Sequence, residues 1–261
     1  MTADGWTKAV RRQLGLGRLL PLGDANDGAW ITERAAETVL RRGTAALRGL
    51  SLGPLRISPA GSDDSDEHDA AVPPPPSALP PGRLRITADF AAVAGPTAEP
   101  FPVLAARLRT VLFATAAERL GLRVTEVDLR VTHLWEGGEE PACPAPEPLP
   151  AAEPPPAAAP PPTAAPPPAA DDENVRAAAA ALSVPGVTHS TRRTTTLGGR
   201  IATGPALRRR HILLEVAVTA ERRALDMARE VRATVSEALP DRPSVAVLIT
   251  AVTVAVPPPG H

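Results

Sequence analysis

The chain has 261 residues, a formal net charge of −1 and one cysteine, Cys143, which excludes an intramolecular disulfide. Hydrophobic residues make up 43% but aromatic residues only 2%, so any core must consist of Leu, Val, Ile and Ala. No run reaches the roughly 18 apolar residues that a membrane-spanning helix needs. The N-terminus also lacks the apolar core of a signal peptide. These features predict a cytoplasmic protein built from small domains of modest stability.

Residues 1–22 have the pattern of a short basic amphipathic arm, because Trp6, Val10 and Leu14 recur at helical spacing. Two interpretations stay open for this arm: a helix that docks on the first domain, which we favour, or an anchor lying in a membrane interface. The residues that would contact the membrane or a partner are Trp6, Lys8, Arg11, Arg12 and Arg18.

Residues 23–136 predict a first α/β module. Thr32 is a good N-cap residue and Glu33 complements the dipole of the helix that follows. An acidic, proline-rich stretch at 59–82 is expected to be a disordered insertion. The remaining elements are expected at 52–58 (strand), 83–90 (strand), 103–120 (helix) and 124–135 (strand). The strands at 83–90 and 124–135 alternate apolar with polar residues, which indicates one buried and one solvent-exposed face and places His133 on the buried side.

A tract of Pro, Ala and Glu at 137–170 predicts a disordered linker, and residues 171–256 predict a second module, followed by a tail at 257–261. The elements of the second module are expected at 171–182 (helix), 187–197 (strand), 211–219 (strand), 224–239 (helix) and 245–256 (strand), with a turn at 198–205. The linkers at 59–82 and 136–174 hold thirteen acidic residues and no basic ones, so the modules are basic and the tethers acidic.

The same order of elements therefore occurs twice, which indicates one supersecondary unit used in both modules. A strand–helix–strand crossover makes its two strands parallel, and the preceding strand joins by an antiparallel hairpin. The expected fold class is α+β, with each module a mixed three-stranded sheet that carries two helices on one face, in the order α-β-β-α-β. Such a sheet leaves its edges and one face open for pairing with another module or with a partner.

Several segments resemble the alkaline-shock protein family of bacterial envelope-stress proteins. The segments that carry the resemblance are the opening Ile31–Ala36, the helix-to-strand turn Val184–Val187, the strand at His211–Ala224 and the helix at Met227–Arg232. The first module departs from the family at Leu50–Pro54, and the tandem arrangement differs from its usual single domain. The resemblance implies a non-catalytic cytoplasmic protein that self-associates and reaches the inner face of the envelope through a membrane-anchored partner.

No catalytic, cofactor-binding or metal-binding residues are predicted. The sequence contains no GxSxG, no HExxH and no Cys–His arrangement. The glycines at Gly15–Gly17 lack the preceding strand of a dinucleotide site, and the five histidines are scattered.

The densest basic stretch lies in the second module and could form one face of a hairpin that contacts an anionic partner. Its residues are Arg192, Arg193, Arg200, Arg208, Arg209 and Arg210. Nucleic acid, anionic lipid headgroups and an acidic protein are all candidates, and a plainly solvated strand edge is the alternative. The scarcity of aromatic residues for base stacking argues against nucleic acid.

The preferred function is a non-enzymatic scaffold or adaptor that associates with proteins at the cytoplasmic face of the membrane. Its partners would be another protein, a membrane-anchored one included, or a second copy, with peripheral membrane contact. The alternative function is a nucleic-acid-associated regulator that uses the Arg-rich hairpin.

Overall fold

The computed structural model describes residues 17–61, 72, 74–75, 77–96, 98–136, 168–193, 211–240 and 242–254. Over these residues the chain has an α+β fold with two mixed sheets, which confirms the predicted class. The elements in chain order are β1 (Leu19–Leu22), β2 (Ala29–Thr32), α2 (Glu33–Thr44), β3 (Leu50–Pro59), β4 (Leu84–Ala94), α3 (Phe101–Ala114), the π-helical segment η1 (Thr115–Leu120), β5 (Val124–Glu136), α4 (Pro168–Leu182), β6 (Val187–Arg193), β7 (His211–Thr219), α5 (Ala224–Ala238) and β8 (Ser244–Thr253).

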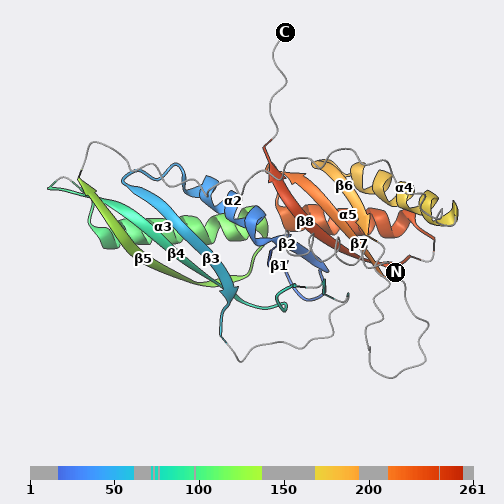
Figure 1. The fold of residues 1–261 in the computed structure, drawn as a ribbon, viewed down its shortest axis with the longest axis horizontal. Coiled ribbons are helices and arrows are strands. Elements are labelled where there is room, and N and C mark those ends of the chain that lie inside the picture. Colours follow the sequence, from blue (N-terminus) through green and yellow to red (C-terminus); the bar gives the residue numbers. More distant parts are fainter. Residues whose placement is uncertain are drawn as a thin grey trace, which may run out of the picture.

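One sheet has three strands in the order β3-β4-β5, and the other has five in the order β1-β2-β8-β7-β6. In both sheets a hairpin precedes a parallel crossover. In the three-stranded sheet, β3 is antiparallel to β4 and β4 is parallel to β5. In the five-stranded sheet, β6 is antiparallel to β7 and β7 is parallel to β8. Figure 1 shows the three-stranded sheet on the left and the five-stranded sheet on the right, with α2 and the β1–β2 hairpin between them.

The five-stranded sheet corrects the expectation of three strands in the C-terminal half. Its two additional strands come from the N-terminal end of the chain, where β2 pairs in parallel with β8 through Ala29–Val247, Trp30–Leu248 and Ile31–Ile249. Leu19–Leu22, expected within a helical arm, is the outer strand of this hairpin. The hairpin forms because β8 is buried on both faces from Val245 to Ile249, and an apolar central strand needs a neighbour on each edge.

Helix α2 begins where the sequence predicts, at the N-cap Thr32, whose hydroxyl accepts a hydrogen bond from the Ala35 N–H. The helix contacts β8 on one side and η1 and α3 on the other, so it lies between the two sheets. Gly43 permits this arrangement, because a Cβ atom there would lie 2.4 Å from the hydroxyl oxygen of Thr115 in η1. The π-helical turn therefore meets α2 at close range.

Both sheets contribute to one contiguous hydrophobic core, rather than to two separate ones. Leu40 of α2, Ile86 of β4, Leu112 of α3, Val216 of β7 and Val247 of β8 all belong to it and are essentially inaccessible to solvent. Burial of apolar surface is the dominant favourable contribution to folding, so the two sheets stabilise each other.

Part of the expected disordered insertion at 59–82 is ordered against the five-stranded sheet. Val72 is buried, and it packs with Leu19, Trp30 and Leu248 on the sheet face opposite the core. The Leu79 N–H donates to the Leu19 carbonyl at 2.8 Å. The apolar residues within this acidic stretch, which its average composition conceals, are the reason that it packs here. Residues 62–71 lie outside the described residues.

Other expectations also fall outside the described residues. The Pro/Ala linker is described only at Pro168–Ala170, which belong to α4, so this helix begins three residues before the expected boundary at 171. The turn at 198–205 and the tail at 257–261 are not among the described residues.

Candidate interaction surfaces

The sequence-predicted basic face is not assembled within the described part of the chain. Arg192 and Arg193 end β6, where their backbones pair with Leu214 and Leu213 of β7. The other four arginines of this face lie outside the described residues: Arg200, Arg208, Arg209 and Arg210.

The residues of the predicted N-terminal arm divide in the same way. Trp6, Lys8, Arg11 and Arg12 lie outside the described residues. Arg18 is described, and its Nη1 donates to the Ile57 carbonyl of β3 at 3.2 Å. Arg18 therefore ties the start of β1 to the three-stranded sheet.

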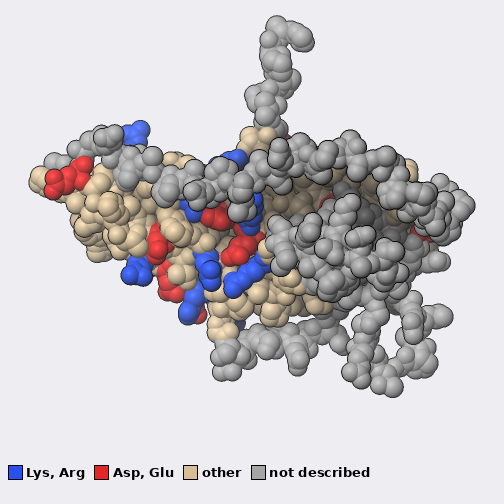
Figure 2. Space-filling view, viewed as in Figure 1, with Lys and Arg blue, Asp and Glu red and all other residues tan. Residues whose placement is uncertain are grey.

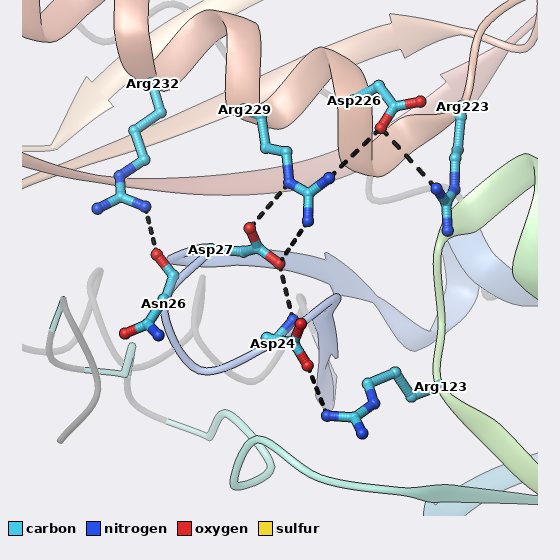
Figure 3. A network of polar contacts seen from close by, with 8 residues as sticks. All are labelled: Asp24, Asn26, Asp27, Arg123, Arg223, Asp226, Arg229 and Arg232. Carbon is cyan, nitrogen blue, oxygen red and sulfur yellow. Dashed lines mark hydrogen bonds and ion pairs between the residues drawn. The ribbon is translucent and has the colours of Figure 1, made fainter. Parts of the chain in front are cut away.

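A polar network joins the turn of the β1–β2 hairpin to α5 (Figure 3). The carboxylate of Asp27 accepts two hydrogen bonds from Arg229, from Nε at 2.8 Å and from Nη2 at 3.0 Å. Arg232, one turn further along α5, donates to the Asn26 carbonyl at 2.5 Å. The turn extends the network to the other sheet, because Arg123 before β5 donates to Asp24 at 2.5 Å.

The network fixes the charge of Asp27. Partial burial acts to raise the pKa of this carboxyl group, but hydrogen bonds from Arg229 and from the Asp24 N–H, with the nearby positive charges, outweigh it. The pKa of Asp27 is therefore lowered, and the same hydrogen bond raises the pKa of Arg229. Asp27 holds the hairpin as a carboxylate.

Apolar contacts close the same junction. Gly121, at the end of η1, has a φ of +89° and accepts a hydrogen bond from the Gly23 N–H at 3.0 Å. A Cβ atom on Gly121 would lie 2.5 Å from the Cβ of Leu225 in α5. The junction therefore leaves no room for a side chain at Gly121.

The edge of β5 is different, because among the described strands β5 pairs only with β4. Its counterpart β8 carries β2 on the corresponding edge. Both strands have a register shift in their parallel pairing, directly after Val131 in β5 and directly after Ile249 in β8. One residue before this shift, Leu248 of β8 is buried and Arg130 of β5 is exposed. Among the described strands, the edge of β8 is therefore covered and the corresponding edge of β5 is not.

The three-stranded sheet has a helix face, which carries Ile86 and Val127 toward the core, and an open face, which carries Arg85 and Asp128. On the open face, Arg85 Nε donates to Glu126 at 2.6 Å and lies 3.4 Å from Asp128. The hydrogen bond from Arg85 to Glu126 raises the pKa of Arg85. Figure 2 shows basic and acidic side chains intermixed where Figure 1 places this sheet. One face of the three-stranded sheet is buried and the other is exposed to solvent, as the alternation of apolar and polar residues predicted.

The second half of β5 exposes apolar side chains. Val131 and Leu134 are 39% and 48% exposed, although they pair with the buried residues Phe90 and Ala92 of β4. A register shift between these two pairs places His133 opposite Ala91 on the open face, where it is exposed. The expectation of a buried His133 is therefore wrong, because the bulge reverses the alternation.

No three or more His, Cys, Asp or Glu side chains cluster as metal ligands within the part of the chain that the structure describes. None of the described helices combines the length and apolar character needed to cross a bilayer. Comparison of the chain with protein-family models, curated proteins and solved structures gave no match.

Proposed function

We propose that this chain is a non-enzymatic scaffold or adaptor that works by protein–protein association through the edge of β5. The observation that carries the proposal is the contrast between two equivalent strands. The edge of β8 is covered by β2, and the edge of β5 is paired with no described strand.

The edge of a sheet is a natural docking surface, because it presents a row of backbone N–H and C=O groups. An added strand gains affinity from main-chain hydrogen bonds and specificity from its side chains on the two faces. The exposed Val131 and Leu134 add apolar area to this edge.

We further propose that the two α-β-β-α-β segments are copies of one unit and that the protein acts at the cytoplasmic face of the membrane. The shared strand order and directions of the two sheets support the first statement. The resemblance to alkaline-shock proteins supports the second, through association with a membrane-anchored partner.

Affinity capture with the full chain tests the association. The bait would be exposed to the membrane and soluble fractions of the cells that express it. We expect a partner to be retained by the wild type and lost from the double variant Val131→Glu/Leu134→Glu. Both side chains are well exposed, so the variant should keep its fold.

The matched control is Val175→Glu, at a 70% exposed position on α4 away from β5. It should retain the partner. Equal capture by the wild type and the β5 variant would contradict the proposal, and a partner found only in the soluble fraction would contradict the membrane location.

A further inference from the structure

Resting on the proposed function, we propose that the partner at the β5 edge is a second copy of this chain. The two β5 strands would pair antiparallel across a two-fold axis that passes through Leu129. A pairing of this kind joins the two three-stranded sheets into one continuous sheet, with the helices of both copies on the same side.

The residues on either side of Leu129 are self-complementary. A two-fold axis at this residue places Asp128 of each copy opposite Arg130 of the other, on the open face. It places Val127 of each copy opposite Val131 of the other, on the helix face. Opposite charges and apolar pairs that face each other directly are the pairs that stabilise antiparallel strands.

Neighbouring registers lack this match. An axis at Asp128 would place two carboxylates opposite each other, and an axis at Arg130 would do the same with two guanidinium groups. An axis between two residues would bring the charged side chains of one copy onto the apolar face of the other. Of the registers compared, the one centred on Leu129 places no like charges opposite each other and keeps charged residues on the open face and apolar residues on the helix face of both copies.

The exposure of the β5 residues near Leu129 is consistent with a second copy of the chain at this edge. Asp128, Arg130 and Val131 are all exposed. Within each copy, Arg85 lies beside Asp128, and Asp89 of β4 pairs with Arg130. The second copy would continue this alternation of charge across the joint. The strand that covers β8 is buried at all four positions, so an apolar strand like β2 does not match the charged open face of β5.

Charge reversal tests the inference on the full chain, by sedimentation equilibrium over a range of protein concentrations. The wild type is expected to dimerise. Asp128→Arg places like charges together, as does Arg130→Asp, so each variant alone should dimerise at least about tenfold more weakly. An equimolar mixture of the two variants should form a heterodimer, because each introduced side chain then faces an opposite charge.

Glu230→Arg on α5, at an exposed site on a helix that packs against the five-stranded sheet, is the matched control and should dimerise like the wild type. Far-ultraviolet circular dichroism would establish that all variants are folded. A mixture no more dimeric than its components would overturn the inference, as would a monomeric wild type at about 100 μM, well above the micromolar range in which specific complexes form. A monomeric wild type that still captures a different protein through Val131 and Leu134 would leave the proposed function standing.

Discussion

The hydroxyl of Thr32 donates a hydrogen bond to the carbonyl oxygen of Thr250 at 3.3 Å, across 218 residues of sequence. The same hydroxyl accepts from the Ala35 N–H at 3.3 Å and so caps α2. One buried side chain thus begins the helix between the two sheets and ties it to the last strand of the five-stranded sheet.

Replacement of Thr32 tests this double contact. Thr32→Ala removes the cap and leaves the buried Ala35 N–H without its acceptor, so we expect the unfolding free energy to fall by about 1–2 kcal/mol. Thr32→Ser keeps the hydroxyl and should lose much less. Urea denaturation of the two variants measures the difference, and equal losses would show that the hydroxyl is not what matters.

The Asp27–Arg229 pair should contribute measurably to stability. Asp27→Asn keeps the shape of the side chain but removes the charge from the two hydrogen bonds with Arg229. Because the Arg229 side chain is 49% exposed and partly screened, we expect a loss of about 1 kcal/mol. The control is Glu230→Gln, which removes an ion pair with Arg222 that is about equally exposed on both sides and should cost less than about 0.5 kcal/mol.

The same pair predicts a dependence on pH. The pKa of Asp27 is lower in the folded chain than its ordinary value of about 3.9. Its contribution is therefore complete above that ordinary value and is lost as the pH falls through the lower, folded value. The stability difference between the wild type and Asp27→Asn should narrow on acidification below about pH 4. A difference that stays constant down to pH 2 would contradict the lowered pKa.

The close approach of η1 and α5 predicts a specific cost for a methyl group at Gly121. Gly121→Ala would suffer backbone strain and a collision with Leu225, for about 2–4 kcal/mol in all. Gly61 has a similar φ of +77° but no heavy atom within 4 Å of a built Cβ, so Gly61→Ala reports the strain alone. Thermal denaturation of both variants gives the comparison. Equal losses of stability in the two variants would mean that Gly121 and Leu225 are not in close contact.

Trp30 should be the main anchor of the hairpin. Its side chain is 2% exposed, and its indole N–H is buried without a hydrogen-bond partner in the structure. Trp30→Ala should cost about 3–5 kcal/mol through the cavity that it creates. Trp30→Phe should cost less than half of that, because it fills most of the space and removes the unsatisfied donor. Denaturant titrations followed by circular dichroism measure both, and a Phe variant as damaged as the Ala variant would contradict this account.

Much of the fold could be predicted because it depends on local patterns. The cap at Thr32, the alternation of Leu84, Ile86 and Ala88, and the apolar stripe of α5 each depend on residues close together in sequence. These elements and their order agree with the structure.

The hairpin escaped prediction because a four-residue apolar run such as Leu19–Leu22 fits a helix or a strand equally well. The signal that could have found it is Asn26-Asp27-Gly28, a turn sequence between two apolar runs. Its pairing with β8 could not be predicted, because the two strands lie more than two hundred residues apart. Local periodicity carries no information about which distant strand lies alongside.

The proposed interaction surface also could not be predicted from local patterns. The arginines of the predicted basic face are recognised by their density in the sequence. The edge of β5 is recognised only when its pairing is compared with that of β8. The bulge after Val131 illustrates the same limit, because one extra residue moved His133 to the opposite face.

The pairing of β2 with β8 has a consequence for synthesis on the ribosome. The hairpin leaves the exit tunnel long before β8 exists, since chains grow at about 5–20 residues per second. For that interval the edge of β2 stays open, and the apolar residues Trp30 and Ile31 lack their β8 neighbours Leu248 and Ile249. Chaperone engagement early in translation, or slow maturation after release, would be the cellular trace of this late closure.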